Sequence, residues 1–187
     1  MEQHASTRYG FVTQTFHWLT ALFVLAAFIY GPDGSEQRVY LPAGDFERQL
    51  HETLGLCVLA LVVLRVLWRM LDTRPAPPPL ARWMEIASKA VQAVLYVLLF
   101  AVPLTAIAGA WLEGHPVTLM AGVQIAPRLG LSHDTGAKIA TLHTLLGDVI
   151  LWAAGLHASA AIYHQLVLKD GVLASMLPSW ALPSSGR

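Results

Sequence analysis

The chain is poor in charged residues. Asp, Glu, Lys and Arg make up 13% of its 187 residues, whereas soluble domains carry about 25%. Hydrophobic residues make up 55%, and the mean hydropathy is +0.52. The formal net charge is zero, so the sequence lacks the basic excess that is typical of nucleic-acid-binding domains. We therefore expect a membrane protein with no nucleic-acid partner.

Cysteine is nearly absent. The single cysteine, Cys57, lies inside an apolar run, which excludes a disulfide framework and the C-x-x-C-H motif that attaches c-type haem. The string from His51 to Gly55 begins like the zinc-binding motif H-E-x-x-H but has glycine in place of the second histidine. This departure excludes a zincin-type site. The absence of a C-x-x-C-H motif means that any haem would have to be bound non-covalently.

Four apolar segments are long enough to cross a membrane, which takes about 20 residues in a helix. They cover residues 11–30, 51–71, 86–112 and 138–168. A proline-rich connector at 73–80 separates the second segment from the third, because a run of prolines does not form helix. The sequence therefore predicts an all-α integral membrane four-helix bundle, with residues 1–187 forming a single transmembrane domain.

Basic residues indicate the orientation of these spans, because cytoplasmic loops are enriched in Lys and Arg. Around the connector at 73–80, four basic residues stand against Asp72 and Glu85; the four are Arg69, Arg74, Arg82 and Lys89. The other two loops, 31–52 and 112–138, hold four basic and seven acidic residues. Both termini are therefore expected on the cytoplasmic side.

Two histidines in the fourth span carry the most information. His143 and His157 are 14 positions apart, just under four helical turns, so they share one helix face about 21 Å apart. A histidine at membrane depth needs a partner. Two such residues on one face suggest two cofactors stacked in the bundle, each with a further ligand from another helix.

The predicted topology supplies those further ligands. His17 lies near the cytoplasmic side, at the depth of His157, and His51 lies near the outer side, at the depth of His143. Each pair can give two axial nitrogens to one iron, and bundle cores commonly hold sites of this kind. We therefore predict an inner haem on His17 and His157 and an outer haem on His51 and His143. The alternatives are core histidines that only form hydrogen bonds, or a zinc or other metal site.

Nearby residues fit a bound macrocycle. Gly55 and Gly147 each follow a predicted ligand by four positions, and Gly155 precedes His157 by two. Glycines allow a flat group to approach the backbone, although small residues also serve helix packing. Arg65 lies 14 positions after His51, at the depth of the inner site. An intramembrane arginine needs an anion; a haem propionate would serve, and the alternative is that Arg65 extends to the membrane boundary.

Several further polar residues have more than one interpretation. His164 follows His157 by seven positions, but it is about 31 Å from His143 along a helix, too far for two haems inside one bundle. It is expected to meet a propionate, a quinone headgroup or solvent. Asp148, expected to be buried in the fourth span, would handle protons or bond a neighbouring helix. Three further histidines are interpreted as surface residues, namely His4, His115 and His133.

Several short motifs follow one another along the chain: Arg8-Tyr9-Gly10, Phe16-His17-Trp18, Leu50-His51-Glu52-Thr53-Leu54-Gly55, Val63-Leu64-Arg65-Val66-Leu67-Trp68-Arg69, and Gly155-Leu156-His157 with His164 and Lys169-Asp170. Their order and spacing resemble those of the bacterial cytochrome b561 family, over about residues 7–178. The resemblance implies a multi-pass protein of the bacterial inner membrane with two b-type haems. Its four histidine ligands correspond to His17, His51, His143 and His157.

The resemblance also implies electron transfer between the quinone pool and another donor or acceptor. One branch of the family is a superoxide:ubiquinone oxidoreductase, an activity that would favour a positive outer surface; the outer loops here sum to −3. Two further hypotheses are an electron-transfer subunit docked to a periplasmic partner, and a haem-free anchor or transporter. A quinone is expected near a membrane-interface tryptophan, for which the candidates are Trp18, Trp68 and Trp111.

Overall fold

The structure is a computed structural model that describes residues 8–32, 39–40, 45–72 and 80–178. Most of the predicted connector at 73–80, the tail after Pro178 and His4 lie outside the described residues.

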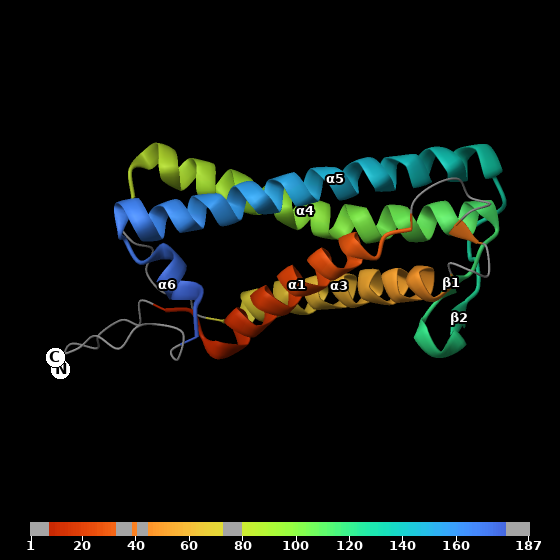
Figure 1. Ribbon diagram of the computed structural model, residues 1–187, viewed down its shortest axis with the longest axis horizontal. Coiled ribbons are helices and arrows are strands. Elements are labelled where there is room, and N and C mark those ends of the chain that lie inside the picture. The colour runs from red at the N-terminus through yellow and green to blue at the C-terminus, as the bar shows by residue number, and fades with distance from the viewer. Residues whose placement is uncertain (1–7, 33–38, 41–44, 73–79, 179–187) are drawn as a thin grey trace.

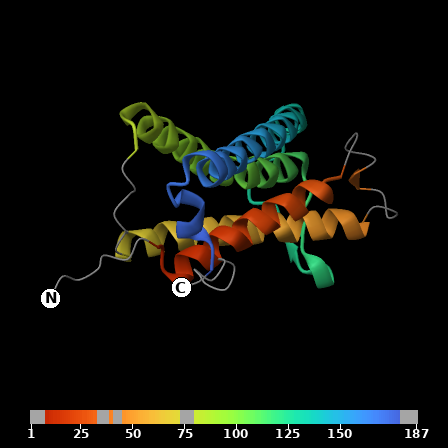
Figure 2. The ribbon, with the colours of Figure 1, turned by 60° about the vertical axis from the view of Figure 1, so that its left-hand side comes forward.

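Four long helices dominate the described chain. They are α1 (Phe11–Ile29), α3 (Asp45–Leu71), α4 (Arg82–Glu113) and α5 (His133–Tyr163), the last continued by the π-helical turn η3 (His164–Leu168). All four are long and apolar enough to cross a membrane, which confirms the all-α prediction with four membrane-spanning helices. Helix α1 lies beside α3, and α4 lies beside α5, so that two helix pairs face each other (Figures 1 and 2).

Three of the helices begin earlier than the apolar runs predicted. Helix α3 begins at Asp45 instead of residue 51, α4 at Arg82 instead of residue 86, and α5 at His133 instead of residue 138. Acidic residues occupy the first turns of α3 and α5, including Asp45 and Asp134. Carboxylates there are favourable because the N-terminal end of a helix carries partial positive charge. The helices therefore extend into polar sequence that a hydropathy criterion leaves out.

The core lies between the two helix pairs. It is formed by Val58 and Val62 of α3, Leu98 and Leu99 of α4, and Ile150 of α5. Many other large apolar side chains point outward, as expected for helices surrounded by lipid; Trp152, for example, is 81% exposed. Helices α4 and α5 approach each other closely at Gly109 and Gly136, where an added Cβ would lie 3.2 Å and 2.6 Å from the facing helix.

The two ends of the bundle differ. At one end the backbone N–H of Tyr9 donates to the carbonyl of Ser175 (3.1 Å), and Trp18 Nε1 donates to the carbonyl of Met176 (2.9 Å). This terminal end includes the short helix α6 (Val172–Met176). The opposite end carries an antiparallel hairpin, β1 (Val117–Thr118) paired with β2 (Gln124–Ile125) across the 3₁₀ turn η2 (Met120–Gly122), and is the hairpin end (Figure 1).

Candidate metal centres

The first candidate centre lies at the hairpin end. His51 of α3 and His143 of α5 face each other with ring centres 6.0 Å apart and ring planes at 81°. His51 Nδ1 lies 2.7 Å from the carbonyl oxygen of Ala27, and His143 Nδ1 lies 2.9 Å from that of Val102. A carbonyl only accepts hydrogen bonds, so each Nδ1 carries the proton and each Nε2 keeps a free lone pair. Both rings are therefore in the tautomer that binds a metal through Nε2.

The end of α1 explains why a carbonyl is available to His51. The backbone N–H groups of Tyr30 and Gly31 bond to the carbonyls of Ala26 and Phe28. The carbonyl of Ala27 is thus one of the last-turn acceptors that a helix leaves without an intrahelical partner. It bonds instead to His51 on the neighbouring helix, which fixes both the tautomer and the orientation of that ring.

The second candidate centre lies toward the terminal end. His17 of α1 and His157 of α5 have ring centres 6.3 Å apart and planes at 77°. Neither ring forms a hydrogen bond with any residue that the structure describes. The guanidinium of Arg65 interacts electrostatically with both imidazoles, and its Cζ lies 5.5 Å from the ring centre of Tyr96. The two candidate centres therefore consist of the same side chains, two histidines each, in different surroundings.

The composition of both centres fits an iron porphyrin. Two imidazoles bonded at about 2.0–2.1 Å on opposite sides of one ion place their ring centres roughly 6.3 Å apart, which matches both pairs. Within the described chain, no group of three or more His, Cys, Asp and Glu side chains is placed to hold a metal. Two histidines therefore need a macrocycle for the remaining ligands, as haem provides.

Two glycines support the same fit. Gly55 and Gly147 are half-buried, and yet an added Cβ at either position would meet no described atom outside its own helix within 4 Å. A flat macrocycle can approach the backbone at such positions. Gly155, in contrast, is exposed, so its open surroundings carry no such implication.

The remaining predicted residues are placed as follows. His164 Nδ1 pairs with the carboxylate of Asp170 at the terminal end. Burial raises the pKa of Asp170, but the hydrogen bonds from His164 and from backbone N–H groups, including that of Val172, together with the electrostatic interaction with His164, outweigh it, so the pKa lies below its ordinary value. His115 stacks on Tyr40 with ring centres 3.6 Å apart.

The prediction that Asp148 is buried was wrong: its side chain is exposed, because it lies about 140° around the helix from His143.

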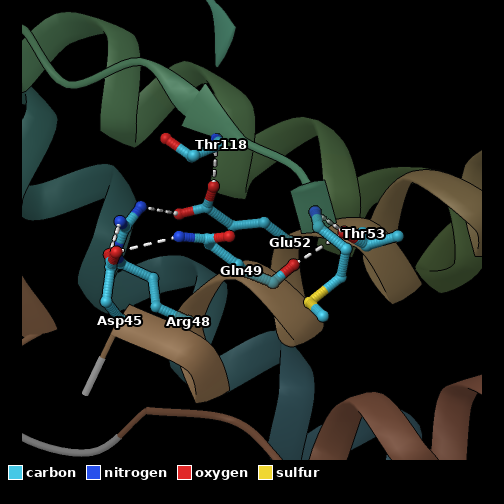
Figure 3. A network of polar contacts seen from close by, with 7 residues as sticks. Asp45, Arg48, Gln49, Glu52, Thr53 and Thr118 are labelled. Carbon is cyan, nitrogen blue, oxygen red and sulfur yellow. Dashed lines mark hydrogen bonds and ion pairs between the residues drawn. The ribbon is translucent and has the colours of Figure 1, made fainter. Parts of the chain in front are cut away.

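A polar network at the hairpin end was not predicted (Figure 3). Buried Arg48 pairs with Asp45 and with Glu52, the latter at 3.0 Å, and Glu52 accepts the backbone N–H of Thr118. Thr53 Oγ1 accepts the backbone N–H of Met120 at 2.9 Å. The network fixes the hairpin to α3 beside His51. Only the i, i+3 and i, i+4 charge spacing of α3 signalled it in the sequence.

Comparison with known proteins places the chain in a family. The family model described as prokaryotic cytochrome b561 matches residues 8–179. Cytochrome b561 homolog 2 of Escherichia coli K12 is 28% identical over 174 residues, which cover 91% of each chain. The probable superoxide oxidase CybB of Yersinia pestis is 28% identical over 165 residues, 87% of this chain and 91% of its own. Cytochrome b562 of Cereibacter sphaeroides is 30% identical over 169 residues, 87% and 90% of the two chains. The chain thus belongs to the prokaryotic cytochrome b561 family of haem-containing electron-transfer proteins of bacterial membranes.

Proposed function

We propose that this chain holds two b-type haems, one on His51 and His143 and one on His17 and His157, and passes electrons between a donor and the quinone pool. The observation that carries this proposal is the pair of histidine couples, 6.0 Å and 6.3 Å between ring centres, at two depths of one bundle. When bound, each haem would act as a one-electron carrier. Two histidines would hold each haem, which would leave the iron no position open for substrate, so the chain would relay electrons and not activate a substrate at the iron.

The proposed topology is a single transmembrane domain in the bacterial inner membrane, with the terminal end in the cytoplasm. The terminal end carries Arg69, Arg82 and Lys89, in agreement with the enrichment of basic residues on the cytoplasmic side. The hairpin end then faces outward. In this orientation the terminal-end pair holds the inner haem and the hairpin-end pair holds the outer haem.

Among the three tryptophans considered for quinone contact, Trp111 is the best candidate. Trp18 Nε1 donates to the carbonyl of Met176 and Trp68 Nε1 to the hydroxyl of Thr13. Trp111 Nε1 is buried and has no hydrogen-bond partner among the described residues. It borders a cavity of about 130 Å³ whose other lining residues are apolar, namely Leu56, Ile107, Val117 and Ile125. A quinone carbonyl would satisfy this donor, and its apolar ring suits such walls.

Superoxide oxidation is the second candidate function, and similarity to a probable superoxide oxidase favours it. Two superoxide ions would give two electrons, and ubiquinone would take these with two protons to become ubiquinol. At the hairpin end, buried Arg48 is paired with Asp45 and Glu52 and exposed Lys138 with Asp134. Exposed Arg128, in the loop before α5, is therefore the cation that an anionic substrate would meet among the described residues. A periplasmic redox protein docked at this end is the other candidate donor.

Rapid mixing of the oxidised, haem-loaded protein with candidate reductants tests the proposed function. Ubiquinol is expected to reduce the haems on the timescale of the rapid-mixing experiment, and dithionite gives the absorbance of the fully reduced protein. Superoxide generated in a parallel sample, with superoxide dismutase as the control, tests the second candidate. Reduction by superoxide that the dismutase abolishes would support the oxidase activity. Failure of both ubiquinol and superoxide, with complete reduction by dithionite, would refute exchange with the quinone pool.

A further inference from the structure

We propose that the tip of the β1–β2 hairpin lies in the bilayer and contacts lipid, in the leaflet at the hairpin end of the bundle. The tip is the segment 119–123, which joins the two strands through η2. It contributes no side chain to either candidate metal centre, and lipid contact there requires neither haem nor quinone. The direction, depth, composition and hydrogen bonding of the tip support this placement.

The hairpin extends sideways from the bundle. The four long helices run roughly along the long axis of the molecule, whereas the hairpin crosses this direction and passes beyond α3, on the side away from α4 and α5 (Figures 1 and 2). Both β1 and η2 contact α3. A hairpin that continued along the helix axes would project into water. This one stays beside a helix that is long and apolar enough to cross the membrane.

The attachment of the tip to α3 indicates its depth. The backbone N–H of Met120 donates to Thr53 Oγ1 at 2.9 Å, and Thr53 is about 12 Å along α3 from its first residue, Asp45. Helix α3 has 27 residues and is therefore about 40 Å long. A bilayer is about 40–45 Å thick with its headgroups, and its hydrocarbon core is about 30 Å thick. A point 12 Å from the end of α3 therefore lies below the headgroups, at the edge of the hydrocarbon core.

The tip presents an apolar surface without charge. Met120 and Val123 are 36% and 57% exposed, and no Asp, Glu, Lys or Arg occurs between Gly114 and Pro127. A charged side chain at this depth would be unfavourable, whereas apolar side chains gain free energy by leaving water. The first charged residue after the hairpin is the exposed Arg128. The charge pattern therefore suits lipid around the tip and water beyond it.

The turn has an apolar residue where hairpin turns usually have a polar one. Ala121 and Gly122 have φ angles of 69° and 77°, the left-handed conformation of the two central residues in a type I′ turn. Asn, Asp and Gly are preferred at such positions, because a short polar side chain can form local hydrogen bonds and glycine has no Cβ. Alanine at position 121 has neither advantage, but it keeps the turn apolar, which suits lipid better than water.

Backbone N–H groups of the tip are bonded within the protein. The N–H of Leu119 donates to the carbonyl of Val123 at 2.7 Å, and that of Gly122 donates to the carbonyl of Leu119 at 3.0 Å. The N–H of Met120 is bonded to Thr53. Irregular backbone is unfavourable in lipid because unpaired polar groups find no water there. These bonds therefore reduce the cost of placing the turn at the edge of the hydrocarbon core.

The placement of the tip also bears on the cavity beside Trp111. Val117 and Ile125, which pair in the same hairpin, line that cavity. With its tip in lipid, the hairpin would hold the cavity at a level that an apolar molecule can reach from the bilayer.

The accessibility of a spin label at the tip tests the proposal. Cys57→Ala removes the single native cysteine, and Val123→Cys then carries one nitroxide in the full chain, which is purified into lipid nanodiscs at one chain per disc. Electron paramagnetic resonance measures collisions of the nitroxide with oxygen, which is enriched in lipid, and with a water-soluble nickel chelate. Each value is taken relative to the same sample under argon, so that any paramagnetic iron in the protein contributes equally to both.

Two exposed positions provide the references. Trp152→Cys, in the middle of α5, reports lipid, and Arg128→Cys, just after the hairpin, reports water. The oxygen-to-nickel ratio of the label at position 123 is expected to be shifted from the value at position 128 toward the value at position 152. Met120→Cys gives a second position in the tip should Val123→Cys not fold.

A charge placed in the tip tests the lipid contact itself. With the nitroxide on Met120→Cys, the further change Val123→Asp should shift the ratio toward the value for water, because a carboxylate is unfavourable in lipid. The matched change Val123→Leu should leave the ratio in place. The unfolding temperature of each variant shows whether the bundle is intact.

Three outcomes would overturn the proposal. A label at position 123 that nickel reaches as readily as at position 128 would place the tip in water. A label that neither oxygen nor nickel reaches would place it against protein. An unchanged ratio in Val123→Asp would show that the apolar side chains do not hold the tip in lipid. None of these measurements depends on haem or quinone, so their outcome is independent of the proposed electron transfer.

Discussion

Replacing His143 with alanine is expected to halve the haem content, from two haems per chain to one, in a protein that still folds. In the proposed pairing, His143 would give the hairpin-end haem one of its two histidine nitrogens, and within the described chain no third metal-binding side chain is placed to replace it. Loss of a residue that only orients a metal ligand weakens binding about 10–100-fold. Loss of the ligand itself should therefore exceed that range and stop electron transfer between the two ends.

The remaining haem identifies which site was lost. In His143→Ala the surviving haem should retain the spectrum and potential of the site on His17 and His157. His157→Ala should give the complementary result. His133→Ala, at the exposed first position of α5, should keep two haems. Two haems with unchanged spectra in His143→Ala would contradict the proposed pairing.

Gly136→Ala is expected to destabilise the packing of α4 against α5. The added Cβ would lie 2.6 Å from Glu113 Cγ, 3.0 Å from the backbone nitrogen of Glu113 and 3.1 Å from the carbonyl oxygen of Gly109. The Glu113 side chain can rotate away, but the two backbone atoms belong to α4 and move only if the helices separate. Overpacking of this kind lowers the free energy of unfolding by about 1–3 kcal/mol.

This effect is measured by thermal unfolding in detergent, with the loss of haem absorbance as the signal that monitors unfolding. For a chain of this size, each kcal/mol corresponds to a decrease of roughly 2–4 °C in the unfolding temperature. Gly130→Ala is the matched control, because an added Cβ there would meet no atom within 4 Å. An unchanged unfolding temperature in Gly136→Ala would show that the two helices do not approach as closely as described.

Hydropathy was sufficient to predict the four helices but not where three of them begin. A spanning segment must be apolar whatever its neighbours are, so its central part is visible in the sequence. Helix α3 instead begins in charged sequence at Asp45. There the helix is favoured by the attraction between acidic side chains and the partial positive charge of the helix N-terminus, and not by insertion into the membrane. The hairpin of β1 and β2 was missed because strands of two residues each show no alternating pattern. Its attachment to Glu52 and Thr53 depends on long-range contacts.

The histidine pairs could be anticipated because helix geometry converts sequence spacing into depth and direction. The groups around them could not. The hydrogen-bond acceptors of His51 and His143 are backbone carbonyls, which have no residue-type signature. The position of Arg65 beside Tyr96 depends on how α3 packs against α4. The exposure of Asp148, in contrast, follows from the same geometry, because Asp148 lies about 140° around the helix from His143, which was predicted to point inward.

A reduced-minus-oxidised visible spectrum of the detergent-purified protein, with haem quantified per chain, tests the central claim most directly. The two histidine pairs predict two b-type haems with the bands of low-spin, six-coordinate iron. One haem per chain would contradict one of the two pairs. A folded protein, supplied with haem and still colourless, would contradict the assignment of these histidines as haem ligands altogether.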